Sequence, residues 1–383
     1  MTSAAPLVML VAHRLADPTA SGVGRYVRSI STALATATDP ALARYAIAAS
    51  AEPDPITWTP DSLACHQIPG SRKLLNLRWS LGPWPRLEGL IPRPDVVHAL
   101  EAFAPIRSGL PRVWTVHDIM PITHPAWYPP RHRYLARRAL DLIRRSPDLV
   151  ITVSAAVERD LLAQGIDPAR IRVIHHGVDD RFRATPTPTV VETVCAEHGV
   201  TRGTFLLAVG GISTRKNLTV LAHALERVPP TRATPELLVT GPSRHGATEV
   251  LDRLARLGDR VRVTGYLPDA DVVVLMHAAL ALVHPSRDEG FGLVPLEAMA
   301  AGAPVLASRS GSVPEAMGSA GILLDPDDAD GWAEAIERIR ENDVHRDSLA
   351  RAGVAHAARF TWERAATATQ AVHLETLERS SHA

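Results

Sequence analysis

The sequence is poor in lysine, asparagine and cysteine. All but two of its 41 basic residues are arginines, and the two lysines are Lys73 and Lys216. Asparagine occurs only at Asn76, Asn217 and Asn342. This bias is typical of GC-rich codon usage, so a lysine or asparagine that persists despite it marks a position of interest.

Other absences exclude whole classes of protein. The two cysteines, Cys65 and Cys195, have neither metal-ligand spacing nor a disulfide framework, which fits a reducing compartment. No apolar run reaches the roughly 18 residues of a membrane span. The N-terminus has no basic residue before its apolar run, unlike a signal peptide. We therefore expect a cytoplasmic protein. The formal net charge of zero does not favour a nucleic-acid partner, and none is expected.

The zero net charge hides a local excess of basic residues. The stretch 72–145 holds thirteen Lys or Arg residues against five acids, and it contains Trp79, Trp84, Trp114 and Trp127. Basic residues interleaved with tryptophan suit peripheral contact with an anionic membrane, on its inner face, or with a lipid-diphosphate acceptor. A solvated face over buried indoles explains the pattern equally well, and both interpretations stay open.

Short apolar runs alternate with helical-period segments along the whole chain, which predicts parallel sheets covered on both faces. The expected strands are Leu7–His13, Tyr45–Ala49, Val96–Leu100, Val113–His117, Leu149–Ser154, Arg172–His175, Phe205–Val209, Glu236–Thr240, Arg260–Thr264, Ala279–His284, Pro304–Ala307 and Gly321–Leu324. The Thr/Pro-rich stretch Arg183–Val194 is interpreted as a linker. The sequence thus predicts an α/β protein of two tandem, Rossmann-like, doubly wound domains, 1–185 and 186–361.

In each predicted domain, a glycine-containing loop follows the first strand. Gly22 and Gly24 precede a helix, where small residues let the backbone approach an anion; a loop without a ligand is as good an explanation. In the second half Gly210 and Gly211 end a strand, Ser213 or Thr214 can cap, and Arg215-Lys216-Asn217 open a helix. Cations at a helix N-terminus oppose its dipole unless an anion binds there. We therefore favour a phosphate site over two solvated cations.

The stretch 286–302 places Glu289 and Glu297 on either side of a glycine turn. Gly290 and Gly292 permit the turn, and the amides from Phe291 to Val294 would face an anion at a helix N-terminus. A glycosidase pair requires carboxyls within about 5–10 Å. Because Glu297 lies inside the expected helix, each glutamate is instead expected to bind a different part of one elongated polar ligand.

Three further groups lie at expected strand ends. His117 and Asp118 end one strand, and we leave a structural and a ligand-binding histidine equally open. His175, His176 and Gly177 are interpreted as structural or nucleotide-adjacent. The acidic run 325–330 precedes a helix, so capping is favoured over metal binding, and no metal site is expected.

At these residues the chain resembles the family 4 retaining glycosyltransferases of GT-B fold. The resemblance covers nearly the whole sequence. Its most specific element is the E-x7-E motif from Glu289 to Glu297. The segments "GGISTRKN", "GYLPDADVVVLMHAAL", "VHPSRDEGFG" and "LEAMAAGAPVLAS" stand in the expected order, as do "SGVGRY", "TVHD" and "VITVSAAVERDLL".

The resemblance implies a metal-independent, retaining hexosyltransferase that needs no cofactor and uses a nucleotide-diphospho-sugar as donor. It implies a donor domain at 186–361 and an acceptor domain at 1–185, completed by a helix at about 362–383, with a cleft between them. The roles it implies are phosphate binding by Arg215 and Lys216, sugar contacts by Glu289 and His117, and ribose contacts by Glu297. The amides of Phe291–Leu293 would contact sugar and phosphates. Other implied donor contacts come from Gly22, Gly24, Gly211, Gly290, Gly292, Val294 and, near the base, Tyr266.

The N-terminal half most resembles bacterial mannosyltransferases of polysaccharide assembly, which favours GDP-mannose over a UDP-sugar. The acceptor would be a saccharide, a lipid-linked sugar or a small molecule. Two other functions stay open: a sugar-nucleotide epimerase of the same fold, and a catalytically silent sugar-nucleotide-binding protein.

Overall fold

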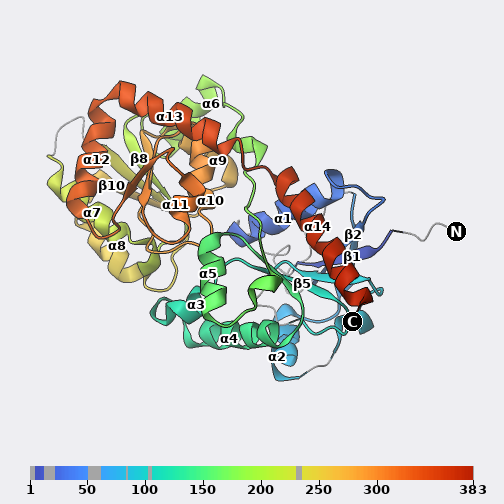
Figure 1. Ribbon diagram of the computed structural model, residues 1–383. Coiled ribbons are helices and arrows are strands. Elements are labelled where there is room, and N and C mark those ends of the chain that lie inside the picture. Colours follow the sequence, from blue (N-terminus) through green and yellow to red (C-terminus); the bar gives the residue numbers. More distant parts are fainter. Residues whose placement is uncertain are drawn as a thin grey trace. The chain divides into compact units, whose positions relative to one another are not determined.

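The computed structural model describes residues 5–12, 22–50, 62–82, 85–101, 106–229 and 235–382. The chain divides into two compact units, shown in Figure 1. Unit 1 comprises Met1–Gly177 and Thr361–Ala383, and unit 2 comprises Val178–Phe360. The division thus falls at residue 177, whereas the sequence placed it at 185.

Unit 1 is built on a parallel sheet of seven strands in the order β3-β2-β1-β4-β5-β6-β7. Its strands are β1 (Leu7–Val11), β2 (Arg44–Ser50), β3 (Ala64–Ile68), β4 (Val96–Ala99), β5 (Arg112–Val116), β6 (Leu149–Thr152) and β7 (Ile171–Val173). Its α-helices are α1 (Gly22–Thr36), α2 (Arg72–Leu81), α3 (Met120–Thr123), α4 (Pro130–Arg145), α5 (Ala155–Ala163) and α14 (Trp362–Ser381). The sequence missed β3, an edge strand of sequence ACHQI, because most of its residues are exposed or polar.

Unit 2 has a parallel sheet of six strands in the order β10-β9-β8-β11-β12-β13. Its strands are β8 (Phe205–Val209), β9 (Glu236–Thr240), β10 (Val261–Gly265), β11 (Ala281–His284), β12 (Val305–Ser308) and β13 (Ile322–Leu324). Its α-helices are α6 (Pro188–Glu197), α7 (Leu218–Arg227), α8 (Ala247–Ala255), α9 (Asp269–Ala278), α10 (Leu293–Ala300), α11 (Val313–Met317), α12 (Ala329–Glu341) and α13 (Asp343–Ala357). Both sheets are parallel, as the apolar strands predicted. Such sheets bind ligands beyond the carboxyl ends of their strands, where β8 and β11 lead into the predicted site.

The predicted linker Arg183–Val194 is wrong. Helix α6 begins inside it at Pro188, and the Thr187 side chain caps the helix by accepting the N–H of Val190. The helix buries Val191 and Val194 and packs against α9 within unit 2. Threonine followed by proline is a signature of a helix start as well as of a loop, and the apolar residues after it decide the outcome.

The last helix, α14, returns to unit 1, as the resemblance implied, and packs along α1 (Figure 1). At its start the backbone of Thr361 and Trp362 passes directly over Gly177. A Cβ on Gly177 would lie 2.3 Å from the Trp362 nitrogen, so a larger residue cannot be accommodated there. Further along, His373 Nε2 lies 2.9 Å from His98 Nδ1, and His98 Nε2 lies 2.8 Å from the Thr115 hydroxyl. A fully buried chain of polar groups thus joins α14 to strands β4 and β5.

This buried histidine pair predicts a loss of stability in mild acid. Burial lowers the pKa of His373 to about 3, and burial together with neighbouring histidines lowers the pKa of His98 well below its usual value. Both rings are therefore neutral in the folded chain, whereas in the unfolded chain they take up protons below about pH 6.5. Stability is then complete above that pH and falls as the pH falls below it. Urea unfolding at pH 7.5 and 5.5 should differ by about 3 kcal/mol, near 1.4 kcal/mol per histidine. Equal stability at the two pH values would contradict the buried neutral pair.

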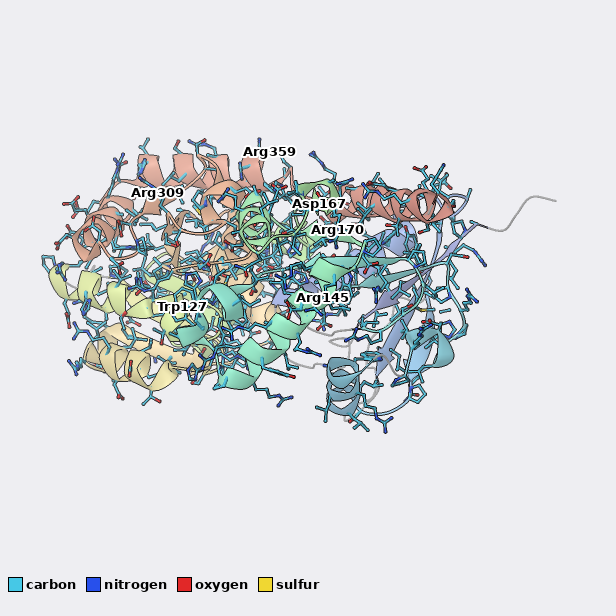
Figure 2. All side chains as sticks on the ribbon, turned by 60° about the horizontal axis from the view of Figure 1, so that its bottom comes forward. Trp127, Arg145, Asp167, Arg170, Arg309 and Arg359 are labelled. Carbon is cyan, nitrogen blue, oxygen red and sulfur yellow. The ribbon has the colours of Figure 1, made fainter. Side chains whose placement is uncertain are left out.

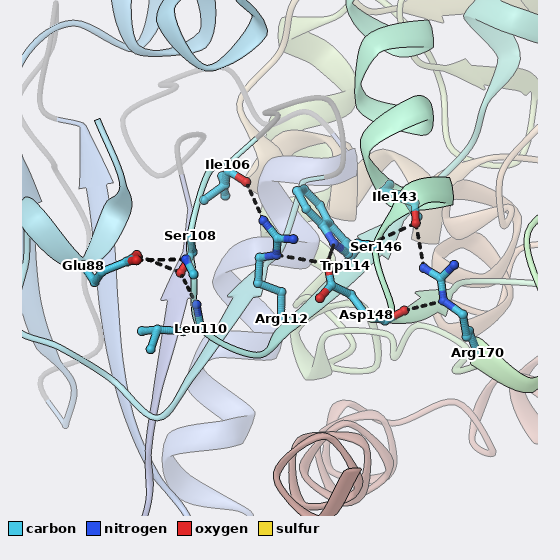
Figure 3. Close-up of polar contacts among 11 residues, drawn as sticks. Glu88, Ile106, Ser108, Leu110, Arg112, Trp114, Ile143, Ser146, Asp148 and Arg170 are labelled. Atoms are coloured by element: carbon cyan, nitrogen blue, oxygen red, sulfur yellow. Dashed lines mark hydrogen bonds and ion pairs between the residues drawn. The ribbon is translucent and has the colours of Figure 1, made fainter. Parts of the chain in front are cut away.

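Two of the tryptophans in the basic stretch are core residues, as the alternative of a solvated face over buried indoles expected. Trp79 and Trp114 are completely buried. The Trp114 indole donates to the carboxylate of Asp148, which also pairs with Arg112 at 3.0 Å, while Arg170 donates to the backbone carbonyls of Asp148 and Ile143 (Figure 3). These indoles therefore serve packing and cannot reach a lipid surface. Trp84 lies outside the described residues.

Candidate functional site

The predicted turn between β11 and α10 is present. Gly292 adopts a left-handed conformation with φ +99° and forms the N-cap of α10, without a side-chain cap. A Cβ there would lie 3.3 Å from the Cβ of Ala316, which together with the positive φ favours glycine. The helix that follows therefore begins with backbone N–H groups that no capping side chain occupies, a suitable arrangement for an anion.

Arg215, Lys216 and Glu289 meet at the carboxyl ends of β8 and β11. Lys216 Nζ lies 2.7 Å from Glu289 Oε1, and Arg215 Nη1 lies 2.8 Å from Glu289 Oε2. The backbone joins the same two loops, because the Arg287 N–H donates to the Arg215 carbonyl at 2.9 Å and Arg215 Nη1 donates to the Asp288 carbonyl at 2.7 Å. The two motifs that the sequence singled out separately therefore form one cluster within unit 2.

The local backbone explains how the two cations are presented. Thr214–Lys216 forms a single 3₁₀ turn, and Asn217 follows in a left-handed conformation with φ +51°. Asparagine tolerates this conformation better than most residues, and its Nδ2 donates to the Pro326 carbonyl at 2.6 Å. The expectation that Arg215-Lys216-Asn217 open the helix is corrected, because α7 begins at Leu218. Ser213 makes no side-chain cap either.

Charge and burial oppose each other in this cluster. Burial disfavours the ionised form of Glu289, but the charges of Arg215 and Lys216 outweigh it and hold the pKa of this carboxyl well below its usual value. Burial lowers the pKa of Lys216, although the charge of Glu289 opposes the shift. The Lys216 and Glu289 side chains are only 12% and 14% exposed. The site is thus a nearly desolvated group of two cations around one carboxylate, where electrostatic interactions are stronger than in water.

His284 belongs to the same cluster, and the sequence analysis gave it no role. Its Nε2 lies 3.2 Å from Glu289 Oε1, and its side chain is 3% exposed. Burial and the charge of Lys216 lower its pKa, so the ring is neutral. A histidine at the end of a strand that leads into the E-x7-E turn was the available signal.

Three serine side chains fix the loop that carries Glu289. Ser308 is the last residue of β12, Ser310 lies in the turn that follows it, and Ser312 is the N-cap residue of α11. Their hydroxyls donate to the carbonyls of Ser286, Arg287 and Glu289 in that order. Between them Gly311 has φ +56°, and a Cβ there would lie 2.9 Å from the Glu289 nitrogen.

Removing the hydroxyl nearest the glutamate should loosen this loop. The Ser312 Oγ donates to the Glu289 carbonyl at 2.7 Å, and the residue is fully buried. For Ser312→Ala we expect unfolding free energy to fall by about 1 kcal/mol and turnover by roughly tenfold, because the carboxylate is less well positioned. Release of nucleoside diphosphate and urea unfolding measure the two effects. Ser348→Ala, an exposed serine of α13, is the control. Native turnover in Ser312→Ala would show that the hydroxyl does not position Glu289.

The other predicted residues of unit 2 differ in how far they are buried. Glu297 lies in α10 and is 1% exposed, while Phe291 is buried and packs against Phe360. Leu293 and Val294 form the first turn of α10 and are half-buried, as is Gly290 before the turn. Gly211 approaches the Arg244 side chain, and Tyr266 follows β10 with 47% of its surface exposed.

The remaining predicted residues lie in unit 1. Gly22 and Gly24 are the first and third residues of α1, and residues 13–21 before them lie outside the described residues. His117 directly follows β5, and its Nε2 lies 3.0 Å from the Leu100 carbonyl. Because a carbonyl only accepts, Nε2 carries a proton. The ring packs edge-on against Tyr26, which also stacks on the buried His176.

The acidic run 325–330 serves capping, as the sequence predicted, and also forms surface ion pairs. Asp328 accepts the N–H of Gly331 at the start of α12, and Asp325 accepts the N–H of Asp327. Asp327 and Asp330 pair with Arg287 and Arg227. Within the described ranges no group of three or more His, Cys, Asp or Glu residues is arranged to hold a metal ion. In the same residues no helix is both long and apolar enough to cross a membrane.

Both halves of the chain match models of glycosyltransferase families. Residues 20–182 match glycosyltransferase family 4, and residues 203–342 match the glycosyl transferases group 1. The chain is 33% identical over 262 residues to the O-antigen chain mannosyltransferase B of Escherichia coli, covering 67% of this chain and 68% of that protein. It is 30% identical over 311 residues to a D-inositol 3-phosphate glycosyltransferase of a Nocardioides species, covering 73% and 67%. It spans about half of the corresponding Corynebacterium efficiens protein.

Solved structures share the fold at lower sequence identity. Anabaena HepE, crystallised with UDP and glucose, superposes with a TM-score of 0.70 at 20% identity and covers 99% of this chain and 100% of its own. A sucrose-phosphate synthase of Thermosynechococcus elongatus gives 0.74 at 21% identity, covering 98% and 99%. With two parallel-sheet units and these relatives, the chain belongs to the family 4 glycosyltransferases and is a hexosyltransferase of GT-B fold.

Proposed function

We propose that the protein transfers a hexose, with retention of configuration, from a nucleotide-diphospho-sugar to a saccharide, lipid-linked or small-molecule acceptor. The observation that carries the proposal is the convergence of Arg215 and Lys216 on Glu289, which lies in the turn that leads into the N-terminus of α10. Two cations and a helix N-terminus suit a diphosphate, and a carboxylate beside them suits sugar hydroxyls.

The reaction needs stabilisation of the leaving group. As the bond from the sugar to the β-phosphate breaks, negative charge grows on that phosphate and the sugar becomes cationic. Arg215, Lys216 and the amides of α10 would neutralise the phosphate charge without a metal. The acceptor hydroxyl would then attack from the face that the phosphate leaves, giving its proton to a phosphate oxygen. Glu289 and His117 would bind sugar hydroxyls and Glu297 the ribose, with no covalent intermediate.

GDP-mannose is the donor that we propose. Its support is the mannosyltransferase of E. coli among the relatives, whereas HepE was crystallised with UDP and glucose. A thermal-shift screen of GDP-, UDP- and ADP-sugars tests the choice, because a ligand that binds only the folded chain raises its Tm. The largest shift with GDP-mannose supports the proposal, and a larger shift with another donor overturns it.

Two other functions make different predictions. A sugar-nucleotide epimerase would isomerise the donor with no acceptor present. A silent binding protein would show the thermal shift but release no nucleoside diphosphate. Incubation of donor with and without a crude glycolipid or oligosaccharide acceptor, followed by chromatography of the nucleotides, separates the three.

We also propose peripheral contact with an anionic membrane through the surface of α4. This helix buries Ala136, Ala139, Leu140 and Ile143, whereas Arg131, Arg137, Arg138, Arg144 and Arg145 are exposed. Figure 2 labels Arg145 at the end of α4 and Trp127 shortly before its start. Exposed leucines of α2, which packs against α4, add apolar area at Leu74 and Leu77.

Vesicle flotation tests this contact. The native chain should float with vesicles containing phosphatidylglycerol in low salt, and less so at high salt, because surface charge attraction is screened. Arg137→Glu/Arg138→Glu should abolish flotation and leave thermal stability unchanged. Equal flotation of native and variant chains would contradict a contact through α4.

A further inference from the structure

The carboxylate of Glu289 has one partner that differs in kind from the other two. Arg215 and Lys216 are cations on side chains with several rotatable bonds, and they belong to the loop after β8. His284 is neutral, lies at the end of β11 and contacts the same Oε1 atom as Lys216. The glutamate is therefore contacted by two charged side chains and by one buried, neutral ring.

The position of His284 is fixed by the sheet. Strand β11 lies inside the unit 2 sheet, between β8 and β12, and His284 pairs in register with Ala307. A small cavity of about 10 Å³ lies beside the ring, lined by Gly210, Lys216 and Ser286 among others. This is roughly the room of one water molecule, so the imidazole has no space to swing away from the cluster.

Resting on the proposed function, we propose that His284 is a positioning residue that holds Glu289 for the sugar while Arg215 and Lys216 bind the diphosphate. A diphosphate between the two cations competes with Glu289 for them, since both ligands are anions. A neutral ring has no net charge to draw it toward the phosphates. Its Nε2 therefore stays next to Glu289 Oε1, 3.2 Å away, and the carboxylate keeps one fixed neighbour while its second oxygen turns to a sugar hydroxyl.

In this arrangement, different residues bind the diphosphate and orient the sugar. Binding of the diphosphate depends on the cations, and orientation of the transferred sugar depends on the glutamate. Loss of the histidine should therefore affect turnover more than nucleotide affinity. A misplacement of a binding group by about 1 Å can cost on the order of a hundredfold in rate.

The test compares His284→Leu with His284→Gln. Leucine has similar volume and no donor, whereas glutamine keeps an N–H donor at a comparable reach. His277→Leu serves as the control, because His277 is a half-buried histidine of α9 in the same unit. Three quantities are measured for each chain. They are the Kd of the nucleoside diphosphate by calorimetry, the kcat of donor hydrolysis, in which water is the acceptor and the nucleoside diphosphate is released, and the Tm.

We expect His284→Leu to keep the nucleoside diphosphate Kd within about threefold while kcat falls 10- to 100-fold. His284→Gln should recover at least a third of native kcat, and His277→Leu should keep all of it. Native kcat in His284→Leu overturns the inference, as does a parallel loss of Kd, kcat and Tm that glutamine does not rescue. A native chain that binds no nucleoside diphosphate at all overturns the proposed function, and this inference with it.

Discussion

Lys216→Ala should lose at least about 99% of its turnover while the protein stays folded. The ammonium lies in a nearly desolvated site, where one positive charge next to the leaving phosphate contributes several kcal/mol to the transition state. Glu289 keeps Arg215 and His284 as partners in the variant, so the carboxylate is not left unpaired. The measurement is the rate of nucleoside diphosphate release at saturating donor, together with Tm.

The control for this variant is Arg227→Ala. Arg227 is a cation of α7 in the same unit, and it pairs with Asp330 on the surface, 45% exposed. Surface pairs of this kind contribute little to stability, so turnover and Tm should both stay native. Full activity in Lys216→Ala would contradict the proposal that the lysine stabilises the leaving phosphate.

Glu289→Gln should bind nucleoside diphosphate more tightly than the native chain and yet turn over 100- to 1000-fold more slowly. The native carboxylate competes with the diphosphate for Arg215 and Lys216, so its neutral analogue leaves both cations to the ligand. The sugar loses the charged acceptor that orients its hydroxyls. Calorimetry and product release measure the two opposite effects.

The same variant should be less stable without ligand. Arg215 and Lys216 would then lie together in a poorly solvated site without a counter-charge, at a cost on the order of 2 kcal/mol. Added nucleoside diphosphate should restore most of the lost Tm. Glu226→Gln, which alters an exposed ion pair with Arg253 on α7 and α8, is the control. Weaker nucleotide binding in Glu289→Gln than in the native chain would contradict the competition.

The sequence predicted the two parallel sheets because apolar runs and helical segments alternate clearly. It missed β3, whose exposed residues lack the apolar pattern of a buried strand. It also misassigned Pro188, because threonine and proline mark both linkers and helix starts. Where an element is decided by one or two residues, packing against a neighbour such as α9 settles it, and that contact is not local in sequence.

The candidate site, too, depends on contacts between residues that are far apart in the sequence. Glycine spacing and the rare Lys216 pointed to both loops, since those signals are local. Lys216 meets Glu289, 73 residues later in the chain, because β8 and β11 are neighbours in the sheet, and the same holds for Arg215. Ser312 could not be found in this way, and the signal at His284 was weak, because single polar residues at strand ends are common. Their roles follow only from which atoms they reach.

The central claim is that Arg215 and Lys216 bind the diphosphate of the donor. The most direct measurement is calorimetric titration of the native chain and of Arg215→Ala/Lys216→Ala with the nucleoside diphosphate and with the nucleoside monophosphate of the same base. We predict that the native chain binds the diphosphate at least tenfold more tightly, and that the double variant binds the two nucleotides equally. A variant that still prefers the diphosphate as strongly as the native chain would contradict the account.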